Sequence, residues 1–376
     1  MLNKDQFSPF DSEDPAYLSE QIITYIGNKR ALLGFIETAV TTVKEELGKD
    51  RLRIADLFSG SSVVSRAMKK HAAELFVNDL EPYCETINRC YLANREELDL
   101  PLLEKTYREV RRRLDEEPLR SGFITELYSP ADDRDIRAGE RVFYTSRNAR
   151  YIDTARQLIE EAPDALRPFL LAPLLYEASV HTNTSGVFKG FYKNSETGIG
   201  QFGGNGRNAL SRILADIRLN MPVFSRFSRP VQIMREDAVT LAPKIPPIDL
   251  AYLDPPYNQH PYGSNYFMLN LINDYRRPDR LSPVSGIPGG WNKSVFNSRA
   301  AARDGIRRLC ESLDARYLLI SFSDDGFFSR DEMVGLLSRF GELRVMDREY
   351  NTYRAARNLG GRELHIREYL YLIRKA

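Results

Sequence analysis

The chain has 376 residues, enough for one large α/β domain and a smaller inserted or appended one, and 42% of its residues are hydrophobic. Its formal net charge of +1 does not by itself indicate a nucleic-acid-binding protein, and no apolar run reaches the length of a transmembrane helix. The polar N-terminal residues show no signal-peptide pattern, so we expect a soluble, cytoplasmic protein that makes no membrane contact. The three cysteines lack metal-ligand spacing and only four histidines are present, so we predict no metal site.

The first predicted element is a helix over residues 31–47, preceded by the sequence Tyr25-Ile26-Gly27-Asn28-Lys29. The helix is predicted from apolar residues that recur at helical spacing, Leu32, Leu33, Ile36, Val40 and Val43. Gly27 and the following asparagine favour a tight loop, which would place Lys29 at the start of the helix. There Lys29 can pair with a carboxylate, although a lysine in such a position is more often a surface charge.

A short strand predicted at 53–58 leads through the small residues 59–62 into a helix predicted at 63–71. A strand, small-residue loop and helix can hold a polar or anionic group at the helix N-terminus, and Gly60 lets the backbone approach such a ligand closely. Capping of the helix by Ser61 or Ser62 is the alternative interpretation.

The next strand, predicted at 75–79, ends in an acidic residue, Asp79. An acid about 20 residues past a glycine loop commonly binds ribose hydroxyls in doubly wound folds. Asp79 is therefore predicted to bind a ribose, and Glu81 is the nearby competitor for this role.

Residues 98–228 are predicted to be an inserted, largely helical segment between two parts of one α/β domain, at 1–97 and 229–376. An apolar stretch at 170–180 is expected to pack this segment onto the main domain. Residues 181–210 mix glycine, asparagine, basic and aromatic residues with little periodicity. Such a loop can approach DNA, with a flexible connection as the alternative, and its candidate DNA-contacting residues are Lys189, Lys193 and Arg207.

The strand predicted at 248–253 stops at Asp254-Pro255-Pro256-Tyr257, because proline has a fixed φ and no N–H. The turn presents a carboxylate and an aromatic ring at the carboxyl end of a strand, where open α/β sheets bind ligands. Asp254 and the carbonyl of Pro255 can accept hydrogen bonds from a planar amino group, and Tyr257 can stack on a base. An ordinary strand-ending turn is the alternative.

Further segments complete the predicted sheet and its surroundings. Asp237 follows a strand predicted at 231–236 and either binds a ligand or caps a following helix. Residues 281–297 are rich in proline, glycine and serine and contain Trp291, so they are predicted to be a mobile loop that orders on binding. The remaining strands are predicted at 317–322, 343–348 and 369–373, which gives five strands with crossovers and a closing pair.

The Asp-Pro-Pro-Tyr turn resembles the catalytic motif of DNA N6-adenine methyltransferases that use S-adenosylmethionine (SAM), in particular those with a target-recognition segment between the SAM loop and the catalytic motif. Residues 25–29 resemble the N-terminal motif that contacts the methionine part of SAM. Residues 56–60 resemble the SAM loop, usually Asp-x-Phe-x-Gly-x-Gly. The chain departs from this pattern at Ser62, where the second glycine is expected. This departure puts in doubt any backbone contact to the cofactor at that position.

The resemblance implies SAM as the cofactor and a doubly wound, mostly parallel, Rossmann-like α/β sheet. It also implies that Asp237 binds the adenine amino group of SAM. The predicted cofactor-binding residues are Tyr25, Gly27, Lys29, Asp56, Phe58, Gly60, Asp79 and Asp237. The predicted catalytic residues are Asp254, Pro255, Pro256 and Tyr257.

The implied function is site-specific transfer of a methyl group from SAM to N6 of an adenine flipped out of double-stranded DNA, in restriction–modification or in marking of host DNA. This function suggests a cognate restriction endonuclease as a partner, and we expect a monomer or a weak dimer. Cytosine-N4, RNA-adenine and protein-amide methylation are alternatives, since each acts on a planar NH₂ group. A DNA-binding module without catalysis is the non-enzymatic alternative.

Overall fold

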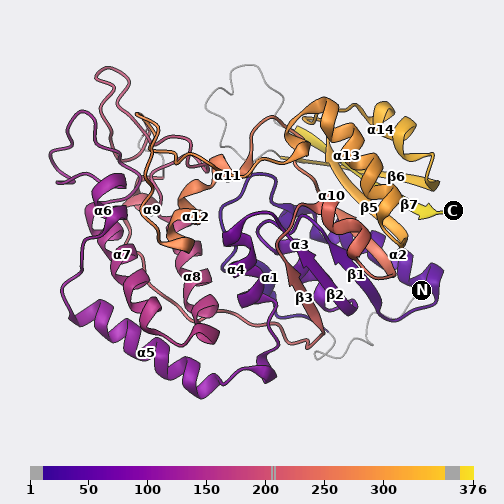
Figure 1. The fold of residues 1–376 in the computed structure, drawn as a ribbon, viewed down its shortest axis with the longest axis horizontal. Helices are drawn as coiled ribbons and strands as arrows, with labels where there is room; N and C mark the ends of the chain where they lie inside the picture. Colours follow the sequence, from indigo (N-terminus) through magenta and orange to yellow (C-terminus); the bar gives the residue numbers. More distant parts are fainter. Residues whose placement is uncertain (1–11, 205, 207–208, 352–364) are drawn as a thin grey trace.

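The computed structural model describes residues 12–204, 206, 209–351 and 365–376 (Figure 1). Its strands are β1 (Leu52–Asp56), β2 (Ala72–Asn78), β3 (Val231–Met234), β4 (Ile248–Leu253), β5 (Ala315–Ser323), β6 (Gly341–Asn351) and β7 (His365–Lys375). They form one sheet in the order β3-β2-β1-β4-β5-β7-β6. Strands β1 to β5 are parallel, and β7 lies antiparallel between β5 and β6. The predicted doubly wound, mostly parallel sheet is confirmed, and the closing strand pair is longer than predicted.

Helices cover both faces of this sheet and build a lobe beside it (Figure 1). The α-helices are α1 (Pro15–Ser19), α2 (Leu33–Leu47), α3 (Val63–Lys69), α4 (Pro82–Tyr91), α5 (Leu100–Glu116), α6 (Phe123–Tyr128), α7 (Ser146–Glu161), α8 (Arg167–Val180), α9 (Leu210–Leu214), α10 (Ala238–Leu241), α11 (Tyr262–Asn265), α12 (Phe267–Asp274), α13 (Arg299–Ser312) and α14 (Arg330–Leu337). The 3-10 helices are η1 (Lys29–Leu32), η2 (Arg95–Glu97), η3 (Asp164–Leu166), η4 (Ala242–Lys244) and η5 (Val295–Asn297). Within the described ranges, no helix is both long and apolar enough to cross a membrane.

Strand β4 shows how the sheet is buried on both faces. All of its residues are buried, as expected of a central parallel strand. Leu250 and Tyr252 pack in a core with α2 and α3, whereas Ala251 and Leu253 pack in a second core with α10, α13 and α14. Because successive residues of a strand face opposite sides, one short run of sequence supplies both cores.

The helical lobe is not built from the inserted segment alone. Its hydrophobic core combines α5 to α8 with residues of α4 and α12, and α12 packs against both α4 and α8. Figure 1 shows α12 beside α8, although it follows the 254–257 turn in the sequence. The predicted role of residues 170–180 is confirmed, because α8 is largely buried and contacts α4. A helix from the C-terminal part of the chain therefore completes the lobe and links it to the sheet.

Candidate active site

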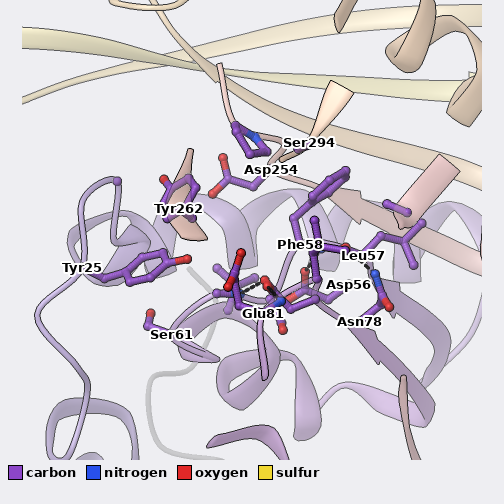
Figure 2. A pocket seen from close by; sticks show the side chains of 18 of the residues that line it. Tyr25, Asp56, Leu57, Phe58, Ser61, Asn78, Glu81, Asp254, Tyr262 and Ser294 are labelled. Carbon is purple, nitrogen blue, oxygen red and sulfur yellow. Dashed lines mark hydrogen bonds between the residues drawn. The ribbon is translucent and has the colours of Figure 1, made fainter. Parts of the chain in front are cut away.

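A pocket lies at the carboxyl ends of β1, β2 and β4, the edge at which parallel sheets bind ligands (Figure 2). All eight predicted cofactor-binding residues line it, namely Tyr25, Gly27, Lys29, Asp56, Phe58, Gly60, Asp79 and Asp237. Of the predicted catalytic residues, Asp254 and Pro256 also line it, whereas Pro255 is buried next to it. Segments far apart in the sequence thus meet around one cavity.

The loop after β1 requires a glycine at position 60, because any side chain there would force its neighbours to move. Gly60 has a φ of +49°, and a Cβ at this position would lie 2.9 Å from the Tyr25 ring. Its N–H donates a hydrogen bond to Asp79 Oδ2 (2.8 Å), and the N–H of Glu81 donates to Oδ1 (3.0 Å). The loop and the predicted ribose-binding acid are therefore fixed to each other.

Ser62 occupies the position of the second glycine in the resembled motif and adopts a glycine-like conformation. Its φ is +66°, a value that L side chains rarely adopt. It is the N-cap residue of α3, but its side chain makes no cap hydrogen bond, so the alternative prediction of serine capping is wrong. Its hydroxyl is buried and has no hydrogen-bond partner among the described residues.

Acidic side chains dominate the pocket. Its lining includes six carboxyl groups and one ammonium group: Asp56, Asp79, Glu81, Glu236, Asp237, Asp254 and Lys29. Burial raises the pKa of Asp56 to about 7, although Ser65 Oγ donates a hydrogen bond to its carboxylate at 2.6 Å. Burial likewise raises the pKa of Glu81 to about 7, and Asn270 Nδ2 donates to its Oε2 at 2.6 Å. Such a pocket favours a cationic ligand.

Asp237 combines the two roles that the sequence left open. Its Oδ1 accepts a hydrogen bond from the N–H of Thr240 at 3.0 Å, so it caps α10. The same side chain also lines the pocket. Capping is confirmed, and a contact to the cofactor stays a prediction.

Tyr25 is held by two tyrosines that follow the 254–257 turn. Its ring stacks on Tyr262 and Tyr266, with centroid separations of 4.9 and 4.6 Å. The same two tyrosines hydrogen-bond the backbone of Ile26. Its N–H donates to Tyr266 Oη (2.6 Å), and its carbonyl accepts from Tyr262 Oη (3.2 Å). Figure 2 shows Tyr262 beside Asp254 at the rim of the pocket. No sequence pattern predicted this stack, and its only signal is the presence of Tyr262 and Tyr266 shortly after the turn.

Lys29 forms a buried ion-pair cluster with the 254–257 turn and β7. Its Nζ lies 3.1 Å from Asp254 Oδ1 and 3.2 Å from Glu368 Oε1, so the predicted pairing with a carboxylate is confirmed. The contact to Asp254 is an ion pair rather than an aligned hydrogen bond. Burial alone would lower the pKa of Lys29, but the charges of Asp254 and Glu368 raise it well above its usual value. Burial raises the pKa of Asp254, and the Lys29 ammonium opposes this shift. No sequence pattern pointed to Glu368.

Tyr257 lies behind the pocket rather than in its lining. Its half-buried ring packs on Phe322 with a centroid separation of 5.3 Å, and Lys29 Nζ lies 5.5 Å from its centroid. Its carbonyl accepts a hydrogen bond from the N–H of Phe327 at 3.1 Å. The ring is therefore partly a core residue, and stacking on a base stays a prediction.

The predicted DNA-contacting loop at 181–210 and the segment 281–297 meet beside the 254–257 turn. Lys189 and Trp291 line one groove, together with Arg280. Lys189 Nζ lies 3.4 Å from His260 Nδ1, close to the end of the turn. Lys193 lies over the ring of Phe191, and Arg207 falls outside the described residues.

A family model described as D12 class N6 adenine-specific DNA methyltransferase matches residues 25–283, more than half of the chain. The chain belongs to this family. It is an enzyme that methylates N6 of adenine in DNA, and a binding module without catalysis is set aside, as are cytosine-N4, RNA and protein-amide methylation.

Curated relatives match along nearly the whole chain. Type II methyltransferase M.NlaIII of Neisseria lactamica is 28% identical over 94% of this chain and 99% of its own length. Type II methyltransferase M.CviAII of Paramecium bursaria Chlorella virus 1 is 29% identical over 93% of this chain and 98% of its own length. Type II methyltransferase M.FokI of Planomicrobium okeanokoites is 26% identical over 93% of this chain but 52% of its own length.

The positive φ of Ser62 generates a stability prediction. Ser62→Gly should raise the free energy of unfolding by roughly 1 kcal/mol, because glycine adopts this φ without strain and the buried hydroxyl is removed. Chemical denaturation measures the difference. Ser61→Gly, one position earlier and without a positive φ, is the matched control and should give no gain. Equal or lower stability of Ser62→Gly would contradict the strain argument.

The raised pKa of Asp56 predicts a pH-dependent cost of folding. Its pKa of about 7 in the folded protein exceeds the value of about 4 for an unfolded aspartate, so stability falls as the pH rises from about 4 to about 7 and stays low above that. Asp56→Asn should therefore raise the melting temperature of the ligand-free protein at pH 8, by roughly 2 °C or more. At a pH near 4 the two proteins should differ little.

Asp249 provides the control for this experiment. Its carboxylate accepts hydrogen bonds from Lys49 Nζ (2.6 Å) and from the N–H of Arg53 (2.9 Å). Asp249→Asn should therefore lower the melting temperature. If Asp56→Asn lowers it too at pH 8, the Asp56 carboxylate is stabilised in the folded protein and the prediction is wrong.

Proposed function

We propose that this D12-class enzyme transfers a methyl group from SAM to N6 of an adenine flipped out of double-stranded DNA at a specific sequence. The observation that carries the proposal is the position of Asp254 at the rim of the acidic pocket, with Oδ1 directed at Lys29. Among the described residues Oδ1 makes no aligned hydrogen bond, and the Asp254 side chain is 17% exposed. An acceptor for the target amine thus borders the donor pocket.

The charge of the pocket supports SAM as the methyl donor. When bound, SAM supplies a methyl group on a positively charged sulfonium, and its methionine part adds an ammonium. A lining of six carboxyl groups and one ammonium group suits these two cations, whereas it would repel an anionic donor. The Gly60 loop and the N-terminal motif at Tyr25 provide close backbone approach and an aromatic wall.

Particular residues are assigned to parts of the donor. Asp79 and Glu81 both border the pocket, and we assign the ribose hydroxyls to Asp79, whose orientation is fixed by two N–H groups. Asp237 would accept a hydrogen bond from the adenine amino group through the oxygen not used in capping α10. Lys29 is 2% exposed and faces Asp254, so we assign it to the catalytic turn as well as to the methionine end of the pocket.

The catalytic turn would act on the amino group of the target. Asp254 and the Pro255 carbonyl accept the two N6 hydrogens, which makes the nitrogen lone pair available to the methyl group. The raised pKa of Asp254 makes it a stronger acceptor for the positive charge that develops on N6. Tyr257 supports the flipped base, while Pro255 and Pro256 keep the turn stiff.

The groove lined by Lys189, Arg280 and Trp291 gives the DNA strand a path to the pocket. Its two cationic side chains suit phosphates, and Trp291 offers a ring for an unstacked base. We assign Lys193 and Arg207 to the same recognition surface, since they follow Lys189 in the predicted DNA-contacting loop at 181–210.

The relatives named Type II methyltransferases support a role in restriction–modification, with a cognate restriction endonuclease as the partner enzyme. We propose that the protein works as a monomer or a weak dimer, in the cytoplasm, where the DNA of a restriction–modification host lies.

Asp254→Ala should abolish methyl transfer and leave SAM binding within a few fold, because Asp254 is assigned to the target amine and five other carboxyl groups of the pocket remain to attract the donor. Sequencing of DNA from cells that express each protein measures N6-methyladenine, and calorimetry measures SAM binding. Asp254→Asn, which keeps the shape but removes the charge, should also be inactive. Wild-type turnover in Asp254→Ala would overturn the role of the turn.

Lys189→Ala combined with Arg280→Ala should weaken DNA binding and lower its salt dependence by about 0.9 units of slope per lost phosphate contact. Trp291→Ala should cost roughly 1–3 kcal/mol of DNA affinity through lost stacking. Lys105→Ala, at an exposed position on α5, is the matched control and should leave the slope as it is. Unchanged DNA affinity in the groove variants would place the DNA path elsewhere. SAM binding should stay constant throughout.

A further inference from the structure

Glu368 is a buried acid for which the reaction scheme above has no role. It lies in β7, outside the residues matched by the family model, and its side chain is 0% exposed. Its Oε1 accepts a hydrogen bond from Ser321 Oγ on the neighbouring strand β5 and lies 3.2 Å from Lys29 Nζ. A carboxylate taken fully out of water costs several kcal/mol unless charges and hydrogen bonds offset the loss. Its burial beside the catalytic turn therefore calls for a functional explanation.

The geometry places one cation between two anions. Lys29 Nζ is nearly equidistant from Asp254 Oδ1, at 3.1 Å, and from Glu368 Oε1, at 3.2 Å. With all three groups ionised, the cluster carries one net negative charge. Only Asp254 has an oxygen directed at the pocket, since Glu368 is enclosed between β5 and the lysine. Of the two acids that share the lysine, Asp254 is therefore the one presented at the rim where the target amine would bind.

We propose that Glu368 is a positioning residue for methyl transfer, which shares the Lys29 ammonium with Asp254 and so keeps Asp254 a strong acceptor for the target amine. This inference rests on the proposed function of Asp254. Glu368 itself does not line the acidic pocket. It acts through the lysine.

Removal of the Glu368 charge should shift the pKa of Asp254 in one direction, downward. The groups that face Asp254 are Lys29 from η1, Glu368 from β7, Asp56 from β1, Tyr252 from β4, Tyr262 from α11 and Tyr257 of the turn itself. The Glu368 charge raises the pKa of Asp254, and the Lys29 charge lowers it. Without Glu368, the lysine pairs with Asp254 alone, so the pKa of Asp254 falls and its carboxylate becomes a weaker acceptor.

The test compares Glu368→Gln, which keeps the size of the side chain, with Glu368→Asp, which keeps the charge. Glu368→Gln should lower kcat about tenfold or more at neutral pH, shift the acid limb of the pH–kcat profile to lower pH, and leave SAM affinity within about twofold. Glu368→Asp should keep the acid limb near its wild-type position. Arg367→Gln is the control on the same strand, at an exposed side chain, and should behave as wild type.

A double-mutant cycle with Lys29 separates positioning from general stability. If Glu368 acts through the lysine, Glu368→Gln should change kcat by less than about twofold in a Lys29→Gln background. If the single variant Glu368→Gln fails to fold, the Lys29→Gln protein can still be compared with the double variant. The double variant removes the buried cation together with one of its partners. Additive losses, or an acid limb that stays in place in Glu368→Gln, would overturn the inference. An active Asp254→Ala would instead refute the proposed function.

Discussion

The burial of the Lys29 ammonium is the constraint on which the site depends. Its carboxylate partners come from the turn after β4 and from β7, while the lysine itself begins η1. An unpaired charge in such a place is strongly unfavourable, and breaking one buried partner typically costs 3–5 kcal/mol. Three segments from the beginning, middle and end of the chain are therefore required to meet, and their meeting point fixes where the Asp254 carboxylate stands relative to the pocket.

The pocket shows a conflict between stability and function. Parallel strands end at the same edge, so the acids at or just after the ends of β1, β2 and β4 are brought together. Burial raises the pKa of Asp56 and Glu81 to about 7. Hydrogen bonds from the Gly60 and Glu81 N–H groups to Asp79 offset part of the cost. The remainder is the kind of strain that a cationic ligand relieves, which explains why a folded protein tolerates so many carboxyl groups around one cavity.

Aromatic packing joins this pocket to the helical lobe. Tyr25 stacks on Tyr262 and Tyr266, and α12 begins directly after Tyr266 and enters the lobe core with α4 and α8. The acidic pocket, the turn and the lobe thus share one packed unit. This sets the distance between the acidic pocket and the groove at Lys189 and Trp291, and a DNA strand in that groove would be held against the catalytic edge.

The sequence by itself determined the class of sheet, the buried β4 and the stop at the two prolines, and the eight residues that it predicts to bind the cofactor all line one pocket. These features follow local rules, since strand periodicity, proline sterics and the glycine requirement at Gly60 act over a few residues. The sequence left helix capping open as an alternative at Ser62, and only the backbone φ of +66° shows that this serine adopts the conformation of a glycine and does not cap. The tertiary structure alone decided the Lys29–Glu368 pair, the tyrosine stack on Tyr25, the packing of Tyr257 on Phe322 and the entry of α12 into the lobe. Each of these joins residues remote in sequence, where neither spacing nor composition carries a signal and the partner is chosen by packing and charge burial in the folded chain.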